Sequence, residues 1–376
     1  MRYISLLLIL SGCSVLLQAQ RSKVISVFQL IETAKYDDAK KAIEEALTDK
    51  KTMEWPKTWY ARGLLCQVAY EKKKTKLYPD QLYVAYESYE KALALDTRGR
   101  LETQLAPLYV RLANEFQMIG ERHYTGRKYD DALKAFEQAL LINRSPILSV
   151  LIDTSLVYNT ALAASEAKQW DKAIGYLSIL HKEKYSSNAS HLLFNVFLEK
   201  GDTASAEKVL LEGIDRYEDH EDMVLLLVDL LFHTNNIEKA VAILDSAAAG
   251  SPSKYIFPYT KSLVYQKTSQ YRKAIDAYEE AINLAPKELK IYSNIGTCYY
   301  NIGVEIDENA RTITNNRIFL EERAKSISAF ESAVEWLEKA HEMAPENQQV
   351  IMKLYQLYNA LLITDKINKM KEKISW

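Results

Sequence analysis

The chain has 376 residues, of which 26% are charged, and its formal net charge at pH 7 is −2. This balance excludes the global positive field with which nucleic-acid-binding proteins attract phosphates, so no nucleic-acid partner is expected. Only 11 glycines occur, which favours long helices joined by short turns.

The N-terminal residues predict export. Residues 1–19 carry an early arginine, an apolar run over 4–17 and a small residue, Ala19. The run is too short for a comfortable transmembrane helix and is typical of a secretory signal peptide that is cleaved after Ala19. No later segment reaches spanning length. The protein is therefore expected outside the cytoplasm, in a bacterial periplasm.

A lipid anchor is the alternative route. Residues 10–13 read Leu-Ser-Gly-Cys, which resembles the bacterial lipobox, in which the cysteine is lipidated and becomes the first residue. The residues that follow Cys13 remain apolar, which favours a continuing signal core over the polar tether of a lipoprotein. Lipidation at Cys13 would make the chain an outer-membrane lipoprotein.

A helix-hairpin pattern recurs over residues 20–376, which we expect to form a single array. Its clearest copy, residues 255–286, contains Ser262, Tyr265, Ala274, Tyr278, Ala281 and Pro286. Alanines seven residues apart mark the places where one helix packs closely on the next, and aromatic residues fill the space around them. Such pairs indicate about eight units; they are Ala39 and Ala46, Ala85 and Ala92, Ala132 and Ala139, Ala173 alone, Ala206 and Gly213, Ala240 and Ala247, Ala274 and Ala281, and Ala333 and Ala340.

In this spacing the chain resembles the tetratricopeptide-repeat family. Its signal ending in Gln-Ala-Gln at 18–20, the run KTWYARG at 57–63, the extended last hairpin and the terminal helix make it similar, more narrowly, to the exported tetratricopeptide-repeat proteins of Bacteroidota. The resemblance implies an all-α fold, an α–α superhelix or solenoid of about eight hairpins that bury one continuous core. It also implies a non-catalytic scaffold for protein–protein interaction.

Three segments depart from the repeat. Residues 304–325 lengthen the eighth hairpin, with a turn expected near 314–316, and form either a longer hairpin or a docking arm. Residues 348–374 have apolar side chains at helical spacing and a lysine-rich end, which predicts a C-terminal capping helix. Residues 144–153 are a candidate break between sub-arrays, although the repeat register resumes at once.

The sequence offers no catalytic, cofactor-binding or metal-binding motif. It has no glycine-rich phosphate loop, no nucleophile elbow and no paired histidines at helical spacing. Cys66 and Cys298 lie six units apart, too far for a disulfide, and are expected to be buried apolar side chains. We therefore expect neither an enzyme nor a bound cofactor.

The family resemblance places the binding surface on the first helix of each hairpin, which lines a concave groove. Polar and aromatic residues on the exposed face of these helices are the candidate contacts: Tyr60, Gln67, Gln117, Tyr124, Tyr158, Asn159, His191, Asn195, Phe232, His233, Tyr259, Tyr300 and Asn301. Rigid aromatic area beside adaptable amides suits peptide binding, while packing between repeats is the alternative role. His191, Asn195, Phe232 and His233 are expected to form one patch.

A carboxylate clamp of the kind that binds chaperone C-termini is not expected. Asn159 fits the middle position of that clamp, but Gln117 and Glu121 stand where its lysine and asparagine belong. The function that remains is a cell-envelope scaffold that binds a partner protein or peptide in its groove, in envelope assembly or secretion. A lipid-anchored lipoprotein or an accessory subunit of an envelope enzyme is the alternative.

Overall fold

A computed structural model describes residues 21–72, 76–148, 153–218 and 220–374. Every regular element in these ranges is an α-helix, and none is a strand. The all-α solenoid predicted from the repeat spacing is confirmed. The predicted signal peptide, with Cys13, lies outside the described ranges.

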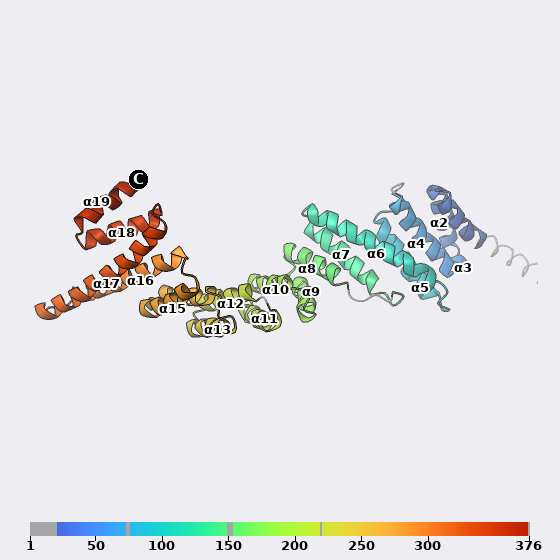
Figure 1. Cartoon of the computed structure of the whole chain (residues 1–376). Helices are drawn as coiled ribbons and strands as arrows, with labels where there is room; N and C mark the ends of the chain where they lie inside the picture. Colours follow the sequence, from blue (N-terminus) through green and yellow to red (C-terminus); the bar gives the residue numbers. More distant parts are fainter. Residues whose placement is uncertain (1–20, 73–75, 149–152, 219, 375–376) are drawn as a thin grey trace, which may run out of the picture. The chain divides into compact units, whose positions relative to one another are not determined.

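The chain divides into two compact units, Met1–Thr203 and Ala204–Trp376, which are described separately. In unit 1, residues 21–32 are helical. They are followed by α2 (Tyr36–Thr48), α3 (Lys50–Met53), α4 (Pro56–Glu71), α5 (Gln81–Leu95), α6 (Glu102–Thr125), α7 (Tyr129–Asn143), α8 (Thr154–Glu166), α9 (Trp170–Lys182) and α10 (Ser187–Glu199). Figure 1 shows them in blue to green as successive antiparallel pairs, and each pair packs on the next.

Small residues set the distance between the two helices of a hairpin. A Cβ atom added to Gly63 on α4 would lie 2.4 Å from the ring of Tyr89 on α5, and one added to Gly120 on α6 would lie 2.5 Å from the ring of Phe136 on α7. Both rings are buried. Each glycine therefore provides the space into which a large aromatic side chain of the partner helix packs.

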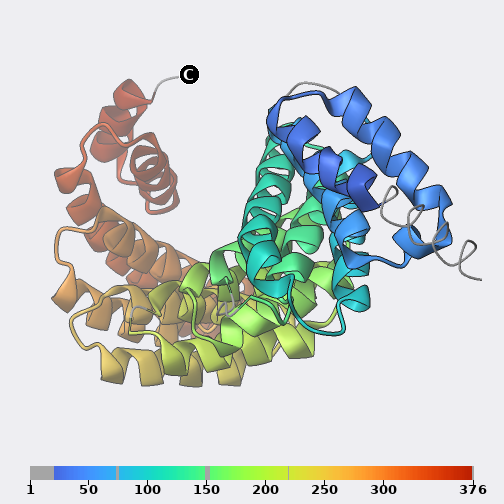
Figure 2. The same ribbon diagram turned by 90° about the vertical axis from the view of Figure 1, so that its right-hand side faces the viewer.

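Unit 2 repeats the arrangement. Its helices are α11 (Thr203–Arg216), α12 (Glu221–His233), α13 (Ile237–Gly250), α14 (Ile256–Lys267), α15 (Tyr271–Leu284), α16 (Leu289–Ala310), α17 (Asn316–Met343), α18 (Gln348–Ala360) and α19 (Thr364–Lys373). From α12 onward each helix packs against the next, and Figure 2 shows the same succession of helix pairs from a second direction. The paired alanines Ala274 and Ala281 are fully buried in one apolar cluster with Ile295 and Cys298.

The first helix of most hairpins ends in the same turn. Arg127, Lys168, Asn235 and Ser269 each take a left-handed backbone conformation, with φ between 56° and 59°. The next residue donates its amide to a carbonyl five positions earlier, as from Lys128 to His123 at 2.9 Å. This Schellman-type closure satisfies carbonyls at the helix end and reverses the chain within a few residues.

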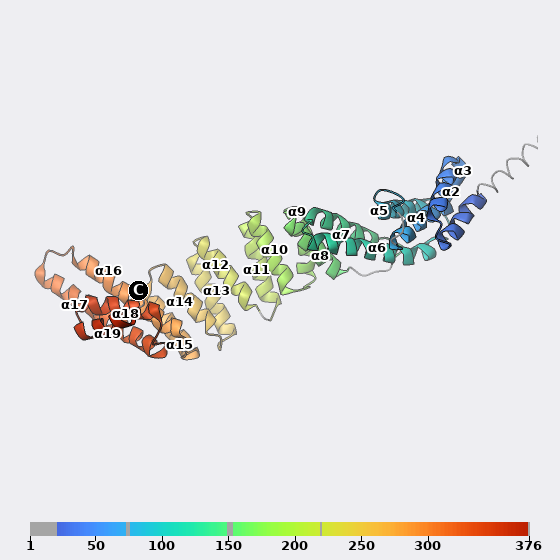
Figure 3. The same ribbon diagram turned by 90° about the horizontal axis from the view of Figure 1, so that it is seen from above.

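The eighth hairpin is longer than its neighbours. Helix α16 ends at Ala310 and α17 begins at Asn316, so the turn lies slightly before the predicted position. The extensions pack on each other, because Ser326 Oγ donates to the Gly303 carbonyl at 2.8 Å and Ala310 is buried. Figure 3 shows α16 and α17 side by side.

The C-terminal segment forms two helices, so the prediction of one capping helix was wrong. Helix α18 ends at Ala360 and α19 begins at Thr364. Leu362 between them is left-handed, with φ 57°, and the amide of Ile363 bonds the Tyr358 carbonyl at 2.9 Å. Apolar spacing continues through this turn, which contains no glycine or proline, and therefore gave no sign of a break.

The candidate break at residues 144–153 coincides with a long connection between α7 and α8. These two helices nevertheless pack on each other, and the boundary between the compact units falls later, at Thr203. Of the helices that the structure describes, none is both long enough and apolar enough to cross a membrane.

Candidate functional site: a pocket on the first helices of unit 1

All the candidate groove residues lie on first helices of hairpins. They are Tyr60 and Gln67 on α4, Gln117 and Tyr124 on α6, Tyr158 and Asn159 on α8, His191 and Asn195 on α10, Phe232 and His233 on α12, Tyr259 on α14, and Tyr300 and Asn301 on α16.

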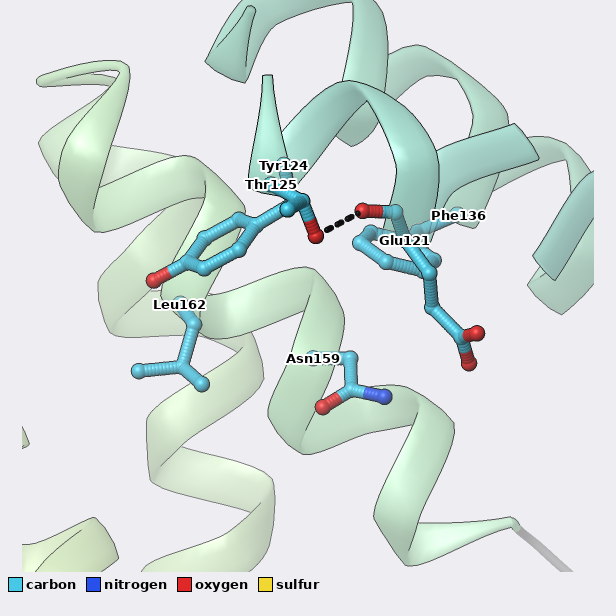
Figure 4. Close-up of a pocket in the computed structure, with 6 residues that line it drawn as sticks. All are labelled: Glu121, Tyr124, Thr125, Phe136, Asn159 and Leu162. Carbon is cyan, nitrogen blue, oxygen red and sulfur yellow. Dashed lines mark hydrogen bonds between the residues drawn. The ribbon is translucent and has the colours of Figure 1, made fainter. Parts of the chain in front are cut away.

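The structure brings two of them together in a pocket. The pocket has a volume of about 130 Å³ and is lined by Glu121, Tyr124, Thr125, Phe136, Asn159 and Leu162. Its walls are the first helices α6 and α8, with Phe136 contributed by α7. Figure 4 shows Glu121 and Asn159 reaching toward the same space from facing helices, and Tyr124 beside Leu162.

Local sequence fixes the helices that carry these residues. Gly120 lets the Phe136 ring pack directly against α6, one residue before Glu121. The hydroxyl of Thr125 donates to the Glu121 carbonyl at 2.8 Å in the last turn of α6. On the opposite wall, the Asp153 side chain caps α8 by accepting from the Leu156 amide at 3.0 Å. The pocket therefore lies on well-formed helical backbone.

Three polar side chains of the pocket, Glu121, Tyr124 and Asn159, keep their hydrogen-bonding groups unused within the described part of the chain, although the Tyr124 ring packs on the Tyr129 ring, with centroids 5.4 Å apart. The Glu121 carboxylate makes no ion pair there, and neither the Asn159 amide nor the Tyr124 hydroxyl makes a side-chain hydrogen bond. Burial raises the pKa of Tyr124, and the nearby Glu166 carboxylate raises it further. Tyr124 is therefore a neutral phenol at physiological pH that is able to donate a hydrogen bond.

These groups are suited to binding. A carboxylate, an amide and a phenol offer acceptors and donors from three directions, and two aromatic rings and Leu162 add apolar area. The volume is below the roughly 300 Å³ of a typical small-molecule site, so the pocket has room for about one side chain of a bound segment.

Most other candidate aromatics contact rings within their own unit. The ring centroids lie 5.4 Å apart for Tyr60 and Phe28, 5.7 Å for Tyr158 and Tyr185, 5.9 Å for Tyr259 and Tyr278, and 5.7 Å for Tyr300 and Phe330. Each of these tyrosines is partly exposed as well. They take part in packing, and their role as groove contacts stays a prediction.

Gln67 does not fit the open groove that the sequence suggested. Its side chain is fully buried, accepts a hydrogen bond from the Tyr89 hydroxyl at 2.8 Å and donates to the Leu108 carbonyl at 3.2 Å. Gln67 therefore links α4 to both α5 and α6 through buried hydrogen bonds. Gln117, in contrast, is half-buried.

The proposed patch of four residues extends over both units. His191 and the exposed Asn195 belong to unit 1. Phe232 and His233 belong to unit 2, where their rings lie 5.9 Å apart. His233 is exposed and pairs with Asp229 at 3.5 Å. Whether the four residues form one patch stays a prediction.

A second pocket was missed by the sequence reasoning. It lies in unit 2, has a volume of about 380 Å³ and is lined by Ser269, Gln270, Tyr271, Arg272, Lys273, Ile302, Glu305, Ile306 and Asn309. One wall is the start of α15, and the other is the extended part of α16. The available signal was the large number of residues between Gly296 and Ala333, which makes α16 longer than the first helix of an ordinary repeat and so provides the second wall of this pocket.

Metal-binding and reactive groups were the remaining possibilities, and the described ranges offer neither. These ranges contain no group of three His, Cys, Asp or Glu residues that could hold a metal ion. Cys66 and Cys298 are free and fully buried. Burial raises the pKa of each thiol to about 12, so both are protonated and behave as small apolar side chains.

Two sequence profiles described as tetratricopeptide repeat match the chain, at residues 197–253 and 259–288. These matches include α12, α13 and α15. No curated protein matches the chain.

Solved structures of repeat proteins are also similar to it. A TPR repeats protein from Bacteroides fragilis is 18% identical, with 66% of this chain and 98% of that chain covered and a TM-score of 0.38. The C-terminal part of a TPR repeat-containing protein from Cytophaga hutchinsonii is 13% identical, with coverages of 68% and 92% and a TM-score of 0.44. A structure of MamA from residue 41 to its end, from Desulfovibrio magneticus RS-1, is 18% identical, with coverages of 51% and 98% and a TM-score of 0.32.

Proposed function

Because this chain carries tetratricopeptide repeats, we propose that it is a non-catalytic scaffold that binds a segment of a partner protein along the first helices of its hairpins. The pocket between α6 and α8 is the observation that supports this proposal most directly. Glu121, Tyr124 and Asn159 line it, and none of them makes a side-chain hydrogen bond or ion pair inside the described chain. Donors and acceptors that converge on a pocket and are not used by the fold are available to an external ligand.

The proposed place of action is the bacterial cell envelope. The signal-like residues 1–19 support export, and the protein would then bind its partner in the periplasm, during envelope assembly or secretion. Mass spectrometry of the purified protein's N-terminus tests the route. Gln20 as the first residue supports secretion, an acylated Cys13 supports a lipid anchor, and an intact Met1 contradicts export.

Site-specific photo-crosslinking tests the binding surface. A photoreactive phenylalanine analogue is placed at Asn159, in the pocket, and in a second variant at Leu141, which is 51% exposed on the second helix α7 of the same unit. In cells of the native host, the Asn159 variant is expected to yield one discrete crosslinked product.

Leu141 is the control, because its side chain is more exposed than the partly buried Asn159 but lies on a second helix instead of a first helix. If both positions give the same products, binding does not prefer the first helices. If neither position gives a product while a probe in unit 2 does, the pocket is not the binding site.

A further inference from the structure

The pocket between α6 and α8 is acidic. Glu121 at its edge is exposed and has no ion-pair partner in the described chain. Glu166, the last residue of α8, lies close enough for its charge to act on Tyr124. None of the six residues that line the pocket is a lysine, arginine or histidine. The local charge is therefore negative and is not neutralised from within the pocket.

The same chain shows what such a combination of residues binds. In unit 1 the Arg62 guanidinium lies 5.1 Å from the ring centre of Tyr78, and Arg62 also pairs with Glu44 at 3.7 Å. The Tyr78 hydroxyl donates to the same Glu44 at 2.6 Å. A tyrosine beside a glutamate thus holds a basic side chain through ring and carboxylate together. Tyr124 and Glu121 also offer a ring and a carboxylate to one pocket, but, unlike Tyr78 and Glu44, they are not hydrogen-bonded to each other.

We propose that the pocket selects a lysine or arginine side chain of the bound segment, an inference that rests on the proposed scaffold function. The charged end pairs with Glu121, and its hydrogen atoms reach the Asn159 amide oxygen. The aliphatic stem packs against Tyr124 and Leu162. A carboxylate ligand would meet Glu121 with like charge, so the pocket rejects acidic segments.

Selection from a library of short random peptides displayed on phage tests this inference on the full chain. The selected peptides are then synthesised, and their affinities are measured by fluorescence anisotropy. We expect them to share one lysine or arginine position. Replacing that residue by norleucine, or Glu121 by glutamine, is expected to lower affinity roughly 10- to 100-fold, as for a charge-assisted hydrogen bond.

A reciprocal charge exchange makes the test specific to the pocket. Glu121→Lys is expected to abolish binding of the basic peptide and to recover it when the peptide's basic residue is changed to glutamate. Glu87→Lys introduces the same charge change at an exposed position on α5 of the same unit and is expected to leave affinity unchanged. Circular dichroism verifies that all variants keep their helicity.

The outcomes separate the inference from the function on which it rests. Peptides that bind but share no basic position, or whose basic preference survives Glu121→Lys, overturn the inference and leave the scaffold function in place. An equal loss of peptide affinity in the Glu87→Lys variant assigns the effect to net charge and also overturns the inference. Failure to enrich any peptide contradicts both the scaffold function and the inference.

Discussion

Individual glycines show how the repeat encodes packing. Gly120 and Gly175 both lie inside helices, α6 and α9. A Cβ atom at Gly120 would lie 2.5 Å from the Phe136 ring, whereas one at Gly175 would meet no atom within 4 Å. The Phe136 ring needs the space that Gly120 leaves, whereas Gly175 makes room for no side chain and only lowers the helix propensity of α9.

We expect opposite effects of alanine at these two positions. Gly120→Ala displaces the Phe136 ring and should destabilise the protein by about 1–3 kcal/mol, as overpacking does. Gly175→Ala should stabilise α9 by roughly 0.5–1 kcal/mol. Urea unfolding followed by circular dichroism measures both. A shift in the same direction for the two variants would contradict the packing assigned to Gly120.

Gln67 is a second residue whose role depends on its neighbours. Its buried amide accepts from Tyr89 and joins three helices. Gln67→Met keeps the volume but leaves the Tyr89 hydroxyl buried without an acceptor, and we expect a loss of about 1–3 kcal/mol. Adding Tyr89→Phe removes the stranded hydroxyl and should recover part of the loss. Strictly additive losses in urea unfolding would show that the two side chains do not interact.

At the scale of the elements, the turns after first helices depend on left-handed residues. Glycine and asparagine take this conformation readily, and Gly201 and Asn235 fit that rule. Arginine, lysine and leucine normally avoid this conformation, yet Arg127, Lys168 and Leu362 have φ near 57°. Packing of the second helix against the first imposes the conformation, and the energy of burial outweighs the local cost.

Leu362 allows this cost to be measured. Its side chain is 83% exposed, so little burial is lost on truncation. Leu362→Gly should stabilise the α18–α19 pair by roughly 0.5–1 kcal/mol, because glycine takes φ above zero without strain. Gly201→Ala provides the reverse test, since φ is 80° and no atom lies within 4 Å. It should destabilise by a similar amount in thermal unfolding, and a neutral result at both positions would refute the account.

At the scale of the whole molecule, the residues that the structure describes include one buried thiol in each compact unit. Cys66 lies in unit 1 and Cys298 in unit 2, and both are fully buried. Because burial raises the pKa of each to about 12, neither forms a reactive thiolate at about pH 8 while its unit is folded. The two thiols therefore report on the two units separately.

Ala281→Trp in unit 2 tests whether the units unfold independently. Ala281 is fully buried in the cluster that contains Cys298, so overpacking should destabilise that unit by about 1–3 kcal/mol or more. In graded urea, alkylation of Cys298 should begin at lower concentration than in the parent, while alkylation of Cys66 should not change. Peptide mass spectrometry measures both. Simultaneous exposure of the two thiols would show that the chain unfolds as one unit.

The sequence by itself determined the repeated hairpins and the helices that carry the candidate residues. Ala274 and Ala281 recur at a spacing that only a helix places on one face, and this information is contained within a short stretch of chain. Helix type and hairpin register follow from such local periodicity. Local periodicity does not tell which residues of two neighbouring hairpins face one another.

The tertiary structure decided the rest. It buried Gln67, separated α18 from α19 by a turn with a left-handed Leu362 and placed Glu121 and Tyr124 across a pocket from Asn159. Each of these outcomes depends on side chains of a neighbouring helix, which are distant in the sequence and meet only when the hairpins pack. Local propensity is worth a few tenths to about one kcal/mol per residue, and such contacts override it.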